Sequence, residues 1–368
     1  MASEGMPAQC GANAPECGSP AALSLLRFSL ALMVMATHLF AATPPQTGRA
    51  AVEAFFCISG FLITMVATGR YAERPAAFLA NRFLRIYPTY WLCLAVAFAV
   101  VTVVPESTTL HPSLYAPRTS SDALANLAIF GLTPETPSRL LPAAWSLHTE
   151  LWFYLVIGLI TAKRPQTTLV ILGMSLLLSG LIVEGRLPLR FYGAPLGNAF
   201  AFFLGSAIWH HRQLLKPPLA FYVAAAGFAC FEILAWMPQP GASDGIVFLA
   251  AIAAAAFLYG LWNVPVDRYL CARACGFAGR LAYPVFLLHW PLGALTWKLL
   301  RVGWGWHLFA LGGAATLAAA TLVVIFFEMP IEKLRAAIRA NRFRFPLMII
   351  FKKYPLFNRS MENGVRAP

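Results

Sequence analysis

Apolar residues in this chain gather into stretches of the length that a helix needs to cross the hydrocarbon core of a bilayer, roughly 17 to 25 residues. One further apolar stretch, at 123–132, is too short to cross and lies between two prolines, so we assign it to a loop as a surface or re-entrant piece. The pattern predicts an all-α polytopic membrane protein with about ten transmembrane helices, at residues 22–42, 51–68, 86–104, 144–162, 166–183, 193–209, 217–236, 244–262, 281–299 and 307–327.

Basic residues fall mainly on one side of these predicted spans. If both termini are cytoplasmic, most of the 28 Lys and Arg residues lie on inner segments, including the stretch IEKLRAAIRANRFRF that begins at Ile331. The positive-inside rule expects this asymmetry, so we predict that both termini lie in the cytoplasm. The outer segments and outer helix ends then hold only Arg49, Arg118, Arg139, Arg186, Arg190, Lys298 and Arg301.

Composition supports the same class. Of 368 residues, 59% are hydrophobic and 12% charged, and the mean hydropathy of +0.66 lies above the range of soluble proteins. We attribute the net charge of +13 to topology and to contact with anionic lipid headgroups, because no nucleic-acid-binding motif is present. We divide the chain into a flexible N-terminal tail over 1–21, a membrane domain over 22–330 and a basic cytoplasmic tail over 331–368.

Several chemistries find no support in the sequence. The chain has neither a glycine-rich phosphate loop nor a Gly-x-Ser-x-Gly elbow, which argues against a nucleotide-driven pump and a serine hydrolase. The seven cysteines, at 10, 17, 57, 93, 230, 271 and 275, are odd in number and lack metal-ligand spacing. We therefore predict no disulfide and no bound metal.

Ionisable side chains interrupt the first two predicted spans. Arg27 and His38 are eleven residues apart, which places them roughly 16 Å apart along one helix. Such groups are costly in hydrocarbon and indicate a working site. His38 is either a general base, because imidazole titrates near neutral pH, or a core histidine bonded to a carbonyl. Glu53, at the start of the next span, either orients His38 as the acid of a catalytic triad does or stabilises a helix N-terminus.

Two further groups suggest a site for a phosphate-bearing ligand. Ser59 and Gly60 either pack helices closely or leave room for a slender ligand arm. Arg82 and Arg85 lie one turn apart, so they either clamp phosphates or anchor the inner end of the third span. Tyr87, which follows them, belongs either to that site or to an interfacial aromatic belt.

Polar residues recur on the fourth and ninth predicted spans. Trp145, His148 and Glu150 open the fourth span at the level of His38, where they can hold an acceptor hydroxyl. Trp145 offers an aromatic face of the kind that stacks on sugars, or it anchors the interface. Tyr283 and His289 add polar groups on the ninth span, and His289 ranks below His38 as a base because no carboxylate is near it in sequence.

Taken in chain order, these residues resemble the acyltransferase-3 family of bacterial integral membrane acyltransferases through most of the chain. The family's Arg, ten residues, His signature falls on Arg27 and His38. Two departures are a Ser-Leu-Leu run before Arg27, where Asp-Gly is frequent, and Glu53 in place of a common Asp. Five other blocks follow in order, at Glu53–Ile63, Arg82–Pro88, Trp145–Glu150, Tyr283–His289 and Glu328–Pro330.

The resemblance implies an enzyme of the bacterial inner membrane that transfers an acyl group, usually acetyl, from cytoplasmic acyl-CoA to a hydroxyl of an envelope or exported polysaccharide. Succinyl-CoA is the alternative donor, and it needs one spare cation near the thioester. We prefer direct transfer, because no Ser or Cys nucleophile accompanies the histidine, and we expect no appended extracytoplasmic domain. His38 and Glu53 would be catalytic, Arg27, Ser59, Gly60, Arg82, Arg85 and Tyr87 would bind acyl-CoA, and Trp145, His148, Glu150, Tyr283 and His289 would bind the acceptor.

Three other functions compete with this interpretation. A secondary transporter would use His38, Glu53 and the two arginines as a proton relay and anion site, but such folds usually show internal repeats and we find none. An acyltransferase for lipids or small molecules keeps the chemistry, and a narrow apolar outer mouth would favour it over an aromatic-lined one. A scaffold protein leaves the ionisable residues in the spans unexplained.

Overall fold

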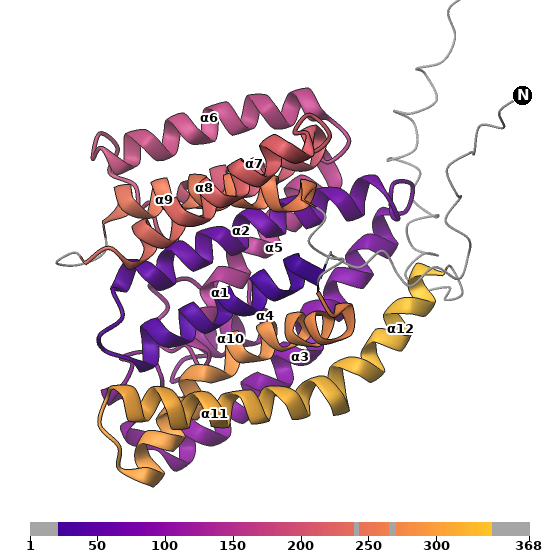
Figure 1. Cartoon of the computed structure of the whole chain (residues 1–368). Helices are drawn as coiled ribbons and strands as arrows, with labels where there is room; N and C mark the ends of the chain where they lie inside the picture. Colours follow the sequence, from indigo (N-terminus) through magenta and orange to yellow (C-terminus); the bar gives the residue numbers. More distant parts are fainter. Residues whose placement is uncertain (1–20, 239–242, 265–269, 341–368) are drawn as a thin grey trace, which may run out of the picture.

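The computed structural model describes residues 21–238, 243–264 and 270–340, and every regular element in these residues is helical (Figure 1). Of the predicted tails at 1–21 and 331–368, residues 1–20 and 341–368 lie outside the described residues, whereas the first part of the C-terminal one belongs to helix α12. The long helices are α1 (Ala21–Leu39), α2 (Pro45–Thr68), α3 (Pro75–Val103), α5 (Trp145–Leu155), α6 (Pro165–Val183), α7 (Pro195–His211), α8 (Pro217–Trp236), α9 (Asp244–Asn263), α10 (Ala272–Leu300), α11 (Trp306–Val323) and α12 (Met329–Arg339).

Shorter helical pieces join or extend these helices. Two π-helical segments, η3 (Val156–Thr161) and η5 (Val324–Glu328), continue α5 and α11. The connection between α3 and α5 holds η1 (Pro105–Thr109), α4 (Ser120–Ala128) and η2 (Pro142–Ala144). Proline begins many of the long helices, because its missing N–H needs no partner in the first turn. It stands at the first residue of α2, α3, α6, α7 and α8.

Eight helical segments in the described residues are long and apolar enough to cross a membrane. The other two predicted spans correspond to α7, which has only 17 residues, and to α10, which contains charged residues and two prolines. The structure is that of an all-α polytopic membrane protein. The count of ten crossings, and the cytoplasmic location of both ends, stay predictions.

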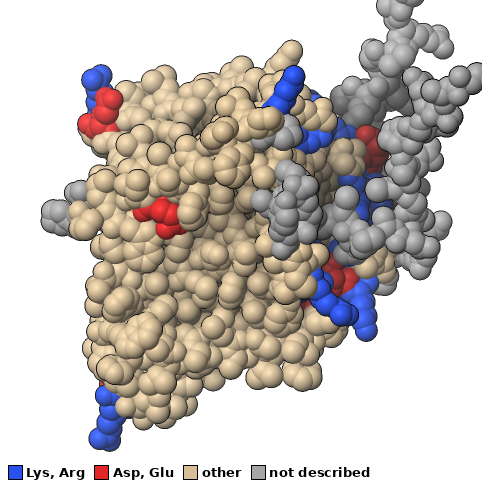
Figure 2. Space-filling view, in the orientation of Figure 1, with Lys and Arg blue, Asp and Glu red and all other residues tan. Residues whose placement is uncertain are grey.

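The helices stack side by side in Figure 1, from α6 at the top through α7, α2, α1 and α10 to α11 at the bottom. Contacts follow the same order, with α1 between α2 and α10, and α2 also against α7 and α9. Figure 2 shows charged residues gathered at the two ends of the molecule, while the middle of the displayed face is almost entirely uncharged. Large exposed apolar side chains such as Met174, Leu177 and Phe326 suit contact with lipid.

Residues 123–128 of the short apolar stretch assigned to a loop lie in helix α4, which aromatic side chains fasten to α3. The hydroxyl of Tyr87 donates to the carbonyl of Ala128 (2.7 Å), and that of Tyr90 donates to Asn126 (2.6 Å). The last carbonyls of a helix have no partner within it. These tyrosines satisfy such carbonyls of α4, so Tyr87 has a structural partner, and it is not among the residues that line the cavity of Arg82 and Arg85.

Helices α2 and α7 touch through their backbones. A Cβ placed on Gly60 would lie 1.9 Å from the carbonyl oxygen of Phe202, and one on Gly205 would lie 1.8 Å from that of Cys57. Small residues permit such approach between membrane helices. Of the two interpretations of Gly60, the structure supports close helix packing and not room for a ligand arm, because the backbone of α7 occupies the space beside it.

We expect Gly60→Ala to lower the yield of folded protein, because α2 and α7 would have to separate. Overpacking of this kind costs about 1 to 3 kcal/mol. Gly173→Ala on α6 is the matched control, since a Cβ there meets nothing within 4 Å. The check is the monodisperse fraction on size-exclusion chromatography in detergent, and equal fractions for both variants would contradict the packing argument.

Candidate active site

Two neighbouring cavities inside the helix bundle contain most of the ionisable residues that the sequence singled out. Val52 of α2 and Phe286 of α10 line both, so the cavities adjoin at these two side chains. The histidine cavity, of about 160 Å³, is also lined by His38, Arg49, His111, Arg139, Trp145 and Tyr192. The arginine cavity, of about 120 Å³, is also lined by Arg27, Ser59, Arg82, Arg85, Glu150, Tyr154 and Tyr283.

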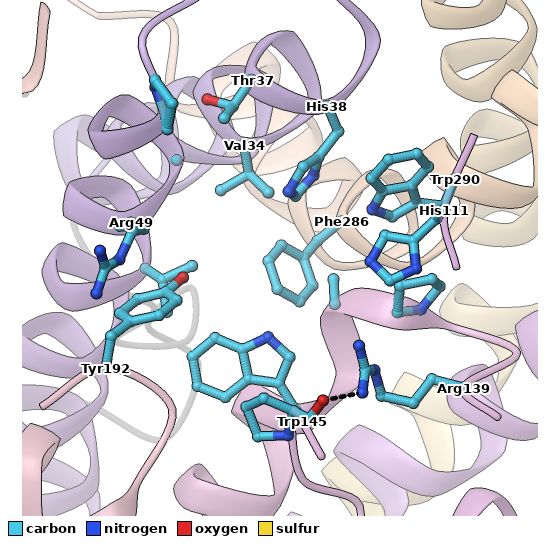
Figure 3. A pocket seen from close by; sticks show the side chains of 16 residues that line it. Val34, Thr37, His38, Arg49, His111, Arg139, Trp145, Tyr192, Phe286 and Trp290 are labelled. Atoms are coloured by element: carbon cyan, nitrogen blue, oxygen red, sulfur yellow. Dashed lines mark hydrogen bonds between the residues drawn. The ribbon is translucent and has the colours of Figure 1, made fainter. Parts of the chain in front are cut away.

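The last turn of α1 and the middle of α10 bring two histidines together at the histidine cavity. Nδ1 of His38 lies 2.9 Å from Nε2 of His289, and the two rings are nearly parallel with centroids 5.0 Å apart. His289 is fully buried, whereas His38 lines the cavity. Figure 3 shows His38, Trp290 and His111 along one side of the cavity, with Arg139 next to His111, and Arg49 and Tyr192 on the opposite side.

The hydrogen bonds around this pair assign the protons of both rings. Nδ1 of His289 is 3.2 Å from the carbonyl oxygen of Val285, which can only accept, so Nδ1 carries the hydrogen. Nε2 of the neutral His289 ring then accepts from the Nδ1–H of His38. Nε2 of His38 is left with its lone pair, as a general base requires.

Glu53 does not contact His38, and its hydrogen-bond partner is a residue of α7. Its carboxylate accepts a hydrogen bond from Asn198 of α7, and its other oxygen is buried without a hydrogen-bond partner. Because α2 already begins at Pro45, Glu53 lies more than two turns inside the helix. The predicted contact between Glu53 and His38 is absent from the structure, and so is the alternative in which Glu53 stabilises the first turn of a helix.

The arginine cavity combines three guanidinium groups with one carboxylate. Arg27 comes from α1, and Arg82 and Arg85 come from α3, where their spacing of three residues directs both into the cavity. Glu150 of α5 accepts hydrogen bonds from Ser59 (2.8 Å) and from Tyr154 (2.6 Å).

Glu328 does not line the arginine cavity, but it holds one of the cavity's walls in place. Its carboxylate pairs with Arg85 (3.5 Å) and accepts from Thr89 (3.2 Å). Tyr283 donates to the backbone carbonyl of Ile86 (3.1 Å), and its ring faces Arg85. A cavity with this excess of positive charge is suited to phosphate groups.

Other predicted residues are divided between the two cavities and positions outside them. Trp145 lines the histidine cavity, whereas Ser59, Glu150 and Tyr283 line the arginine cavity. His148 lies outside both cavities, where its Nδ1 accepts from the backbone N–H of Gly131 (3.0 Å).

Sequence reasoning missed several residues that line the cavities. Tyr154 had a readable signal, because it follows Glu150 by one helical turn. Arg49 and Tyr192 carried no comparable pattern. His111 and Arg139 come from the long connection between α3 and α5, whose path across the bundle no periodicity reveals.

Comparison with known proteins points to one family. Residues 21–325 match the acyltransferase-3 family model, described as an acyltransferase domain. The exopolysaccharide production protein ExoZ of Rhizobium meliloti is 28% identical over 322 residues, covering 81% of this chain and 92% of that protein. The peptidoglycan O-acetyltransferase OatA of Listeria monocytogenes is 26% identical over 358 residues, covering 84% of this chain and 55% of OatA. No solved structure matches the chain.

Proposed function

Because this chain belongs to the acyltransferase-3 family and is an O-acyltransferase of the membrane, we propose that it transfers an acyl group from cytoplasmic acyl-CoA to a hydroxyl of an envelope or exported polysaccharide in the bacterial inner membrane. Acetyl is the acyl group that the name of OatA supports. Exopolysaccharide is the class of acceptor that the name of ExoZ supports.

The observation that carries this proposal is the junction of the two cavities at Val52 and Phe286. Arg27, Arg82 and Arg85 suit the phosphates of CoA on one side of the junction. His38 lies on the other side. A thioester arm bound along the arginine cavity would pass the junction and present its carbonyl carbon to the histidine cavity.

The chemistry then follows from the proton assignment at His38. The acceptor hydroxyl gives its proton to Nε2 of His38 as its oxygen attacks the thioester carbonyl. The C–S bond breaks, and the CoA thiolate takes the proton from the imidazolium. The Nδ1–H of His38 stays bonded to His289, which holds the ring in place through both steps.

The lining of the histidine cavity favours a sugar over a lipid as acceptor. Trp145 and Tyr192 present aromatic rings 4.9 Å apart at its wall, and aromatic faces suit stacking on sugar rings. His111 and Arg139 add hydrogen-bond donors. A lipid acceptor would call for an apolar lining.

The proposal is tested with purified protein in detergent by following CoA release from acetyl-CoA and succinyl-CoA in the presence of oligosaccharide. Mass spectrometry of the oligosaccharide identifies the acylated product. We expect CoA release coupled to acylated sugar. Acylated lipid in place of acylated sugar would reject the acceptor, and folded protein that turns over neither donor would reject the reaction.

We expect Val52→Phe to lower kcat for acyl transfer by at least about tenfold while changing the KM for acyl-CoA little. A ring at the junction narrows the passage for the thioester but leaves Arg27, Arg82 and Arg85 in place. Val247→Phe is the matched control, because Val247 on α9 is fully buried and lines neither cavity. Both variants carry the cost of overpacking, so equal effects on kcat would remove the argument for a passage.

A further inference from the structure

The wall of the histidine cavity carries positive charge and no negative charge. Arg49 and Arg139 line it, and no Asp or Glu of the described residues does. Arg49 is paired with Asp244 and lies over the ring of Tyr192. Arg139, in contrast, has no carboxylate within ion-pair distance in the described part of the chain.

Arg139 is held firmly, with one edge of its guanidinium left without an acceptor. Its Nη1 donates to the backbone carbonyls of Thr133 (3.3 Å), Pro134 and Thr136 (2.8 Å). Nη2 makes no hydrogen bond to the described residues, and Nε is buried without a partner. The residue is only 9% exposed. Buried donors of this kind normally have acceptors, and Figure 3 shows the guanidinium at the cavity.

His111 supplies a second donor beside Arg139. It lies in the connection after η1, outside the membrane-spanning helices, and its Nδ1 accepts from the backbone N–H of Ser113 (3.2 Å). Burial and the positive charge of Arg139 lower the pKa of His111 to about 4. The ring is therefore neutral near pH 7, and its hydrogen is on Nε2.

His111 and His38 contact the same tryptophan ring, and Arg139 lines the same cavity. The ring centroid of Trp290 is 4.8 Å from that of His111 and 4.9 Å from that of His38. A small ligand in the histidine cavity can therefore reach the base and these donors at once. The carboxylate that acts most on Arg139, Glu135, is exposed and paired with Arg190, so it does not fill the vacant edge.

We propose that the histidine cavity binds a carboxylate carried by one of the two substrates, and that Arg139, assisted by His111, recognises it. An arginine edge and a carboxylate match in bidentate geometry. The inference rests on the proposed function. The carboxylate has two possible sources, the far end of a dicarboxylic acyl group such as succinyl, or an acidic sugar of the acceptor.

Binding to the purified protein tests this inference without requiring turnover. Calorimetric titrations compare succinyl-CoA with acetyl-CoA, and a uronic-acid oligosaccharide with a neutral one of the same length. We expect the wild type to favour the carboxylate in one of the two pairs. Arg139→Gln should reduce the ratio of the two affinities in that pair by roughly ten- to hundredfold, the usual contribution of a hydrogen bond to a charged group.

Two further variants separate recognition from folding. Arg118→Gln removes an exposed cation of the same connection that lines neither cavity, and it should leave the preference intact. His111→Phe keeps a ring against Trp290 but removes the donor, and it should weaken the preference several-fold without disturbing the bonds of Arg139 to its loop.

The outcomes distinguish a failure of this inference from a failure of the proposed function. Equal binding of the members of both pairs, or a preference that survives Arg139→Gln, overturns the carboxylate site alone. An equal loss for neutral and acidic ligands also overturns it, because Arg139 would then be structural. Failure of both acyl-CoA molecules to bind the wild type contradicts the proposed function as well.

Discussion

His38→Ala lowers kcat for acyl transfer by about 10²- to 10⁴-fold, the usual contribution of a general base. The loss appears in kcat because the imidazole acts on the proton of the acceptor and not on the binding of CoA. The KM for acyl-CoA should change little, since the arginine cavity is untouched. Steady-state kinetics with acyl-CoA and oligosaccharide measure both constants.

Two other histidine substitutions serve as comparisons for His38→Ala. His307→Ala, at an exposed position on α11, is the matched control and should retain full activity. His289→Phe removes the acceptor for the Nδ1–H of His38, so it should lower kcat less than the loss of the base itself. If His38→Ala and His307→Ala behave alike, His38 is a core histidine and the base lies elsewhere.

Replacing Arg82 and Arg85 together with alanine raises the KM for acyl-CoA by about 10²-fold or more. Each hydrogen bond to a charged group contributes roughly 1.5 to 3 kcal/mol, and the two guanidinium groups share one cavity. Arg85 is also paired with Glu328, so Arg85→Ala alone leaves that partly buried carboxylate without its cation. Arg82→Ala is the cleaner single variant.

The control for the arginine pair is Arg164→Ala, which removes an exposed cation just before α6. It should leave the KM for acyl-CoA unchanged. Direct binding of CoA to each variant separates a loss of affinity from a loss of fold. The assignment of the arginine cavity to the donor fails if the double variant raises the KM of the oligosaccharide but not that of acyl-CoA.

Hydropathy located the membrane helices well but misplaced several of their ends. The third predicted span begins at 86, whereas α3 begins at Pro75. The intervening turns contain Asn81, Arg82 and Arg85, which lower the hydropathy although they face the protein. Helix α10 similarly begins at Ala272, before the predicted start at 281. The length of an apolar stretch indicates how much of a helix contacts hydrocarbon, and these two helices extend beyond that region.

The sequence indicated many residues of the candidate site, but it did not indicate which of them contact one another. Arg82 and Arg85 line one cavity, as their spacing suggested, and Arg27 lines it too, as the family resemblance implied. The contact of His38 with His289 joins positions 251 residues apart and depends on how α1 packs against α10. Glu53 received the wrong partner because a start of α2 at Pro45 places it against α7. Such contacts depend on how the helices pack, and the pattern of a single sequence does not indicate that packing.

The central claim is that adjoining cavities bring a cytoplasmic donor and an acceptor from the opposite face to His38. Proteoliposomes with the protein in one known orientation test it, with radiolabelled acetyl-CoA supplied on the cytoplasmic side and oligosaccharide on the other. Our account predicts labelled oligosaccharide on the acceptor side, and none with His38→Ala. Label that reaches oligosaccharide only when donor and acceptor share one side would contradict it.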